Sequence, residues 1–302
     1  MQVPYQGVLS YLSPKSEVVS KDACAGRTSW RPHYDDRGST TKGESVSESS
    51  DTRQGMQSVL RSLDVLEAVA LSQPVGISAL ARSLGIPKAT VHRILRTLGE
   101  AGWLAPQGAP GEQRWVLTAR ALAVGARVMT QDDLRERARP VLEDLGRRTD
   151  ENIHLSVPDG ESLVLIDKVP STRPVQTVAQ VGERVPMILT ASGWAYLSHL
   201  PVSERVARIP PVVDLATGTR LTRNEVLAEL EAVAGRGFAI NPGRWRPDVS
   251  AIGSAITDRQ GQPVAALSIS LPSYRLTDDL HEPYGQLVME ATARISAELA
   301  RR

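Results

Sequence analysis

Residues 77–98 read Ile-Ser-Ala-Leu-Ala-Arg-Ser-Leu-Gly-Ile-Pro-Lys-Ala-Thr-Val-His-Arg-Ile-Leu-Arg-Thr-Leu, two short periodic segments joined at Gly85. Two helices that cross at close range need a small residue at the crossing, which Ala81 supplies. The turn between them needs a residue that tolerates a left-handed backbone, which Gly85 supplies. The apolar positions that would clamp the two helices together are Leu80, Leu84, Ile86, Val91 and Ile94. The stretch therefore predicts a helix-turn-helix, a unit that binds DNA in many proteins.

The second of these helices has two distinct faces. At ~100° per residue its apolar residues fall on one face and its polar and small residues on the opposite one. The polar face is what a recognition helix presents to the major groove, and the helix N-terminus suits phosphates. Arg93 would read a guanine through O6 and N7, and Ala89 would contact a thymine methyl group. The candidate DNA-binding residues are Lys88, Ala89, Thr90, His92, Arg93, Arg96 and, beyond the helix, Arg114.

Charge supports this interpretation, although plainer ones exist. The chain has a net charge of +1, yet residues 78–98 hold four Lys or Arg and no acidic residue. A solvated amphipathic helix pair is the plain alternative for the whole stretch. His92 is equally a passive surface residue or a phosphate contact, and Arg114 is a phosphate contact or merely solvated.

The flanking sequence completes a winged helix-turn-helix domain over residues 55–118. Periodic apolar residues begin near Met56, and a turn-rich segment at 106–111 separates two short strand patterns, as expected for a wing. A linker helix is predicted over 119–134. Residues 1–54 are predicted to be disordered, because residues 37–54 hold one aliphatic residue, Val46, and cannot bury enough apolar surface.

Residues 135–302 predict an α+β domain built on an antiparallel sheet. The expected strands are Ile153–Val157, Leu163–Lys168, Val175–Val181, Ile252–Thr257 and Val264–Leu271. Turns are expected at 158–160 and at Gly261. Thr222 and Glu225 form a capping box that opens a helix, and a final amphipathic helix ends near Leu299.

Composition and motif searches exclude several classes of protein. A single cysteine, Cys24, excludes an intrachain disulfide framework and a cysteine-rich zinc site. No signal peptide and no apolar run near the ~18 residues of a membrane span are present, so a cytoplasmic protein without a membrane partner is expected. The five histidines lack metal-ligand spacing, and Ser192 lacks a Gly-x-Ser-x-Gly elbow. We therefore expect no catalytic residues, no metal and no cofactor.

Taken together, these residues resemble the IclR family of bacterial transcription factors, from about Gln57 to Leu299. The Leu84–Arg93 run is similar to the family's recognition element, with Ala89 where Ser is usual. Further matching stretches are Ala138–Leu145, Asp167–Lys168, Val181–Met187, Arg236–Ile240 and Ala265–Ser270. The resemblance implies a homodimer joined through the winged domains and linker helix, often paired into a homotetramer.

The resemblance also implies a C-terminal domain of profilin- or GAF-like form that binds a small, commonly acidic, effector. Carried over by position, the effector-binding residues are Met187, Ala191, Ser192, Asn241, Ala251, Ser268 and Ser270. Ser268 and Ser270 lie two apart on an expected strand, so their hydroxyls point to the same side. Paired hydroxyls suit a carboxylate. The alternative is that both serines only fill a tight polar sheet surface.

This chain departs from the family pattern in the expected pocket. Residues 188–190 read Ile-Leu-Thr where His-Ala-Thr is frequent, and Trp194 stands where Lys is common. Asn241 replaces a common Asp, Ala251 replaces a common Cys, and the usual acidic pair is replaced around residues 243–246. The departures predict a less acidic, bulkier pocket for an organic acid or aromatic metabolite.

The expected function is regulation of transcription through double-stranded operator DNA, as a repressor rather than an activator. An enzyme with an appended DNA-binding domain and a ligand-free architectural DNA binder are the alternatives. The size of the C-terminal domain argues against the second of these.

Overall fold

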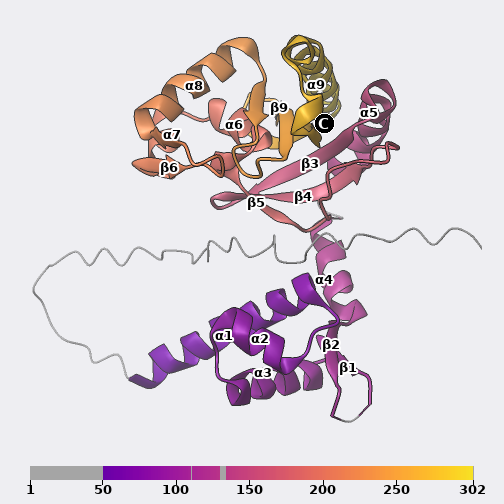
Figure 1. Ribbon diagram of the computed structural model, residues 1–302, viewed down its shortest axis with the longest axis vertical. Coiled ribbons are helices and arrows are strands. Elements are labelled where there is room, and N and C mark those ends of the chain that lie inside the picture. The colour runs from indigo at the N-terminus through magenta and orange to yellow at the C-terminus, as the bar shows by residue number, and fades with distance from the viewer. Residues whose placement is uncertain (1–49, 110, 130–133, 302) are drawn as a thin grey trace, which may run out of the picture. The chain divides into compact units, whose positions relative to one another are not determined.

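The computed structural model describes residues 50–109, 111–129 and 134–301 (Figure 1). The prediction of disorder for residues 1–49 falls outside this range. For residues 50–54 it is wrong, because helix α1 (Ser50–Ser72) begins at Ser50. Val65 and Val69 of this helix are fully buried. Once such a face nucleates a helix, each further turn adds hydrogen bonds at little cost, so the helix extends into polar sequence.

The winged domain has the predicted elements in the predicted order. They are α1, α2 (Ile77–Leu84), α3 (Lys88–Glu100), β1 (Leu104–Gln107) and β2 (Arg114–Leu117). Gly85 adopts φ 64° and ends α2 with its N–H bonded to the Ala81 carbonyl. Leu80, Val91, Leu95 and Trp115 form the core with the buried face of α1. The local pattern around Gly85 is therefore enough to specify this domain.

The helix predicted after the wing is described over part of its expected range. Helix α4 (Ala119–Met129) covers most of the expected 119–134, and residues 130–133 lie outside the described part of the chain. Leu134 is instead the first residue of α5 (Leu134–Thr149). Leu134 is buried in the core of the C-terminal domain, so it belongs to that domain and not to the linker helix.

The C-terminal domain is a six-stranded antiparallel sheet with helices on both faces. Its strand order is β5-β4-β3-β10-β9-β8. The strands are β3 (Asn152–Asp159), β4 (Ser162–Val169), β5 (Arg184–Pro186), β8 (Ala239–Pro242), β9 (Val249–Thr257) and β10 (Pro263–Pro272). This arrangement confirms the α+β prediction with an antiparallel sheet.

The helices sort onto the two faces because side chains alternate along each strand. One face, with Leu155, Ile252 and Leu267, packs against α5 and α9 (Asp278–Leu299). Figure 1 shows these two helices on one side of the sheet and α6 (Ala191–Ser198), α7 (Val202–Arg208) and α8 (Arg223–Arg236) on the other. The helix α8 begins with the predicted capping box of Thr222 and Glu225. A short hairpin, β6 (Val212–Asp214) and β7 (Arg220–Thr222), lies between α7 and α8 in the sequence.

The predicted strand at Val175–Val181 is wrong. This segment is irregular, and Val175 and Val178 are exposed. Its carbonyl groups accept hydrogen bonds from side chains instead of a neighbouring strand: Lys168 Nζ donates to Ala179, Arg246 Nη1 to Val178 and Arg275 Nη1 to Val175. Two of these donors, Arg246 and Arg275, come from distant parts of the sequence, so the local pattern of apolar residues could not reveal them.

Candidate functional site

Helix α3 buries its apolar face and exposes the face predicted to meet DNA. Val91, Ile94 and Leu95 are buried, whereas Ala89, His92, Arg93 and Arg96 are exposed, as is Lys88. Thr90 is half-buried. Pro87 stands at the N-cap, and no acidic residue lies in the first turn, so no carboxylate of the helix neutralises its N-terminal dipole. This arrangement leaves a basic surface and free backbone N–H groups for phosphates.

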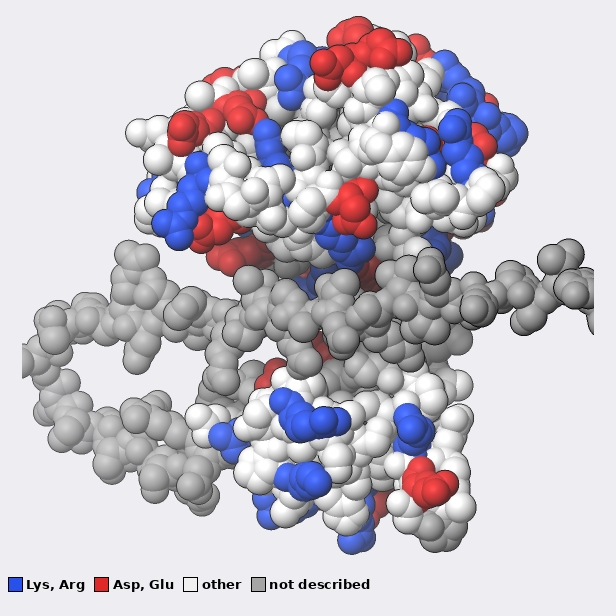
Figure 2. Space-filling model, in the orientation of Figure 1, with Lys and Arg blue, Asp and Glu red and all other residues white. Residues whose placement is uncertain are grey.

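Some basic side chains of the winged domain also make contacts within the protein. Arg96 pairs with Glu100 at 3.3 Å, but both side chains are more than half exposed, so water competes for the contact. Arg114 in the wing is exposed and donates to the Pro74 carbonyl at 3.4 Å. Figure 2 shows separate Lys and Arg side chains on the visible face of the winged domain. The basic groups are therefore distributed for contact with an extended anion.

A cavity of about 80 Å³ lies in the C-terminal domain, on the sheet face opposite α5 and α9. It is several times larger than the ~10–15 Å³ that one water molecule needs. All the predicted effector residues except one line it: Ala191, Ser192, Asn241, Ala251, Ser268 and Ser270. Met187 does not. Its side chain is 3% exposed and packs in the core with Leu163 and Trp194, because the 3-10 turn Met187–Leu189 directs it inward.

Two glycines bring the start of α6 to the wall of this cavity. A Cβ on Gly253 of β9 would lie 2.9 Å from the Ser192 backbone nitrogen. A Cβ on Gly193 would lie 1.8 Å from the Met187 carbonyl oxygen. The Thr190 side chain caps the helix by accepting from the Gly193 N–H at 3.2 Å. Only glycine allows this close approach, and the sequence alone did not identify either position.

The sheet contributes hydroxyl groups to the cavity. Ser268 and Ser270 lie on the same side of β10 and are 4% and 5% exposed. The Ser270 hydroxyl lies 3.2 Å from the Thr177 hydroxyl, which accepts from Asn152 Nδ2. The Asn241 side chain is already engaged, because it donates to Leu189 and accepts from the Arg244 backbone N–H. The serines therefore offer the more available donors.

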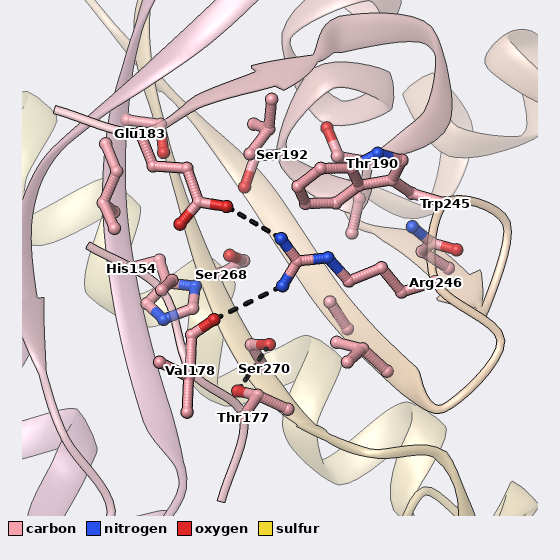
Figure 3. A pocket seen from close by; sticks show the side chains of 18 residues that line it. His154, Thr177, Val178, Glu183, Thr190, Ser192, Trp245, Arg246, Ser268 and Ser270 are labelled. Carbon is pink, nitrogen blue, oxygen red and sulfur yellow. Dashed lines mark hydrogen bonds and ion pairs between the residues drawn. The ribbon is translucent and has the colours of Figure 1, made fainter. Parts of the chain in front are cut away.

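A charged pair that the sequence did not assign to the site also enters the cavity. Figure 3 shows Arg246 directed toward His154 and Ser268, beneath Glu183. Its Nη2 donates to Glu183 at 2.8 Å, and its guanidinium lies 4.2 Å from the centre of the Trp245 ring. The departures from the family pattern around residues 243–246 predicted a bulkier pocket but did not identify an arginine inside it.

His154, which lines the cavity, is a neutral group near pH 7. Burial, together with the positive charges of Lys168 and Arg246, lowers the pKa of His154 to about 4. His154 is therefore neutral near pH 7 and offers one N–H donor.

Within the described residues, no group of three or more His, Cys, Asp or Glu could hold a metal ion. No described helix is long and apolar enough to cross a membrane.

Comparison with known families gives two matches that together span most of the described chain. A profile described as "Bacterial transcriptional regulator IclR C-terminal" matches residues 126–297. A profile described as "IclR helix-turn-helix domain" matches residues 58–108.

Individual relatives agree with these matches. The regulator KdgR of Escherichia coli K12 is 29% identical over 247 residues, which cover 81% of this chain and 93% of KdgR. The regulator Rv1719 of Mycobacterium tuberculosis is 31% identical and covers 74% of this chain and 85% of its own.

Solved structures share the fold. A transcriptional regulator from Rhodococcus sp. RHA1 superposes with a TM-score of 0.66 at 28% identity, covering 80% of this chain and 98% of its own. An IclR homolog from Microbacterium hydrocarbonoxydans, solved in complex with 4-hydroxybenzoate, has a TM-score of 0.67 at 23% identity, covering 80% of this chain and 98% of its own.

Proposed function

This chain belongs to the IclR family of bacterial transcriptional regulators, and on that basis we propose that it is a repressor whose operator binding is controlled by a small organic acid. The proposal rests above all on one observation: the chain combines an exposed basic helix α3 with a cavity lined in part by hydroxyl groups. The helix supplies the DNA contact. The cavity supplies a place where a metabolite can bias the protein between two states.

The effector would be an organic acid or aromatic metabolite. Hydroxyl donors, a neutral histidine and an arginine suit a carboxylate, and Trp245 offers a flat apolar surface. A protein of the same fold is known in complex with 4-hydroxybenzoate, an acid of this kind. We propose Ala191, Ser192, Asn241, Ala251, Ser268 and Ser270 as contacts, and the repressor would act in the cytoplasm, where bacterial DNA lies.

A second copy of the chain would complete the DNA-binding unit. Large apolar side chains are exposed on α1 and α4, among them Leu63, Leu71 and Leu122 at 50%, 81% and 74%. Water would contact these groups in a monomer, whereas a partner would cover them. We propose a homodimer through this surface, with a homotetramer as the larger assembly.

Replacement of Arg93 by alanine tests the DNA-binding role. We expect specific operator affinity to fall by ~1–3 kcal/mol, because one good base contact is worth about that much. Binding to scrambled DNA should change less. Gel-shift titrations on both DNAs measure the difference.

The control for this variant is Arg220→Ala, on the β6–β7 hairpin of the C-terminal domain, where the side chain is 76% exposed. It should leave both affinities unchanged. Equal losses on operator and scrambled DNA for Arg93→Ala would make Arg93 a phosphate contact and would refute its role in base recognition.

A further inference from the structure

The cavity contains a carboxylate of the protein itself. Glu183 accepts from Arg246 Nη2 through Oε1 at 2.8 Å, while its Oε2 accepts from the Gln180 backbone N–H at 3.0 Å. The Glu183 side chain is 22% exposed and that of Arg246 is 40% exposed. This ion pair is therefore partly accessible from solvent and is not sealed in the core.

The remaining polar side chains of the cavity are hydroxyls, an amide and an imidazole, all of which can donate a hydrogen bond. Among the described residues that line it, Glu183 is the one carboxylate and Arg246 the one guanidinium. The hydroxyls of Ser192 and Ser268 lie around the pair (Figure 3). His154 is neutral because burial and the nearby cations lower its pKa to about 4. A cavity with several groups that can donate, and with a single carboxylate that is already paired, matches a ligand that brings its own carboxylate.

We propose that the ligand of this cavity is a compact monoanion whose carboxylate replaces Glu183 on Arg246. The proposal rests on the proposed function and specifies the ligand class for it. After the exchange Arg246 still has an anionic partner. The Glu183 carboxylate borders solvent, so it can turn outward while it still accepts from the Gln180 backbone N–H. A neutral ligand leaves the ion pair intact and gains nothing from Arg246. A dianion brings a second charge for which the lining residues hold no further cation.

Trp245 restricts the shape of that monoanion. Its ring stacks on the Arg246 guanidinium at 4.2 Å from the ring centre, so the flat surface lies next to the anion site. A carboxylate attached directly to a flat group can then meet the guanidinium while the flat group lies beside the indole, one face of which Arg246 covers. Benzoate is the simplest probe of this kind, and benzamide is its neutral counterpart of nearly equal shape.

The test is calorimetric titration of the full-length protein with benzoate and benzamide. Glu183→Gln keeps the size of the side chain and removes the competing charge. We expect it to bind benzoate roughly tenfold more tightly than the unmodified protein, and benzamide with little change. Arg246→Gln should weaken benzoate binding by roughly tenfold or more and affect benzamide little.

The matched control is Glu229→Gln. Glu229 also pairs with an arginine, Arg244, that stacks on a tryptophan, Trp194, but it does not line the cavity. This variant should leave benzoate binding unchanged. The melting temperature of each variant, measured in parallel, reports whether it is folded.

Two outcomes would overturn the proposal. If Glu183 only holds the irregular segment in place, Glu183→Gln will weaken benzoate and benzamide binding alike. If benzamide binds as well as benzoate, or if Glu183→Gln binds no benzoate, the cavity does not select a monoanion through Arg246. Either result leaves effector-controlled operator binding standing, whereas a protein without specific DNA binding would refute the proposed function itself.

Discussion

Gly193→Ala is expected to destabilise the C-terminal domain by about 3 kcal/mol or more, the upper part of the range for overpacked sites. The added Cβ would lie 1.8 Å from the Met187 carbonyl oxygen, a backbone atom that no rotamer change can move aside. The start of α6 would have to shift away from the 3-10 turn. Because Ala191 and Ser192 line the cavity, ligand binding should be lost together with stability. Chemical denaturation measures the first effect and calorimetry the second.

Gly235→Ala is the matched control. Gly235 is exposed in helix α8, and a Cβ there meets nothing within 4 Å. The change should stabilise the protein by ~0.5–1 kcal/mol, because alanine loses less backbone entropy than glycine in a helix. A Gly193→Ala protein as stable as the unmodified one would contradict the close packing of α6 on the turn.

The double variant Ser268→Ala with Ser270→Ala should abolish the response to the effector and leave operator binding intact. Each lost hydrogen bond to a charged group costs ~1.5–3 kcal/mol of affinity. The effector for this test is the organic acid that most raises the melting temperature in a screen of monocarboxylates. Removal of the ligand contacts should remove the switch and not the DNA contact, because a ligand acts only through its differential affinity for two states.

Ser254→Ala is the control that distinguishes the loss of a ligand contact from the loss of a structural hydrogen bond. Ser254 is also a buried serine of the sheet, at 4% exposure, but its hydroxyl bonds Gly237 and Thr292 and it does not line the cavity. It should lower stability without changing the response. Normal effector binding by the double variant would place the ligand elsewhere. Loss of operator binding would make Ser268 and Ser270 structural residues.

The sequence predicted the winged domain well because its determinants are local. Gly85 adopts the left-handed turn, and the apolar residues at helical spacing are the ones that are buried. The paired strands on either side of Gly261 were predicted for the same reason, since alternation and a turn residue act over a few positions. In the cavity, positions carried over from the family resemblance placed together six side chains from four separate parts of the sequence.

Non-local contacts account for what the sequence did not predict. The segment 175–181 is rich in valine, as many strands are, but side chains from β4, the loop before β9 and the turn after β10 bind its carbonyls. Which residue of the 243–248 loop enters the cavity depends on the path of that loop, so Arg246 could not be distinguished from Arg244. The glycines at 193 and 253 matter through atoms of other elements, which a sequence pattern does not contain.

Footprinting of the purified protein on genomic DNA fragments that it selects tests the regulator proposal most directly. One recognition helix reads only a short stretch of DNA, and a symmetric dimer presents two. We expect two protected half-sites related by a dyad, with centres ~10 base pairs or a multiple of that apart, and a dimer or tetramer in sedimentation. Protection without a preferred sequence, or a single half-site bound by a monomer, would contradict the account.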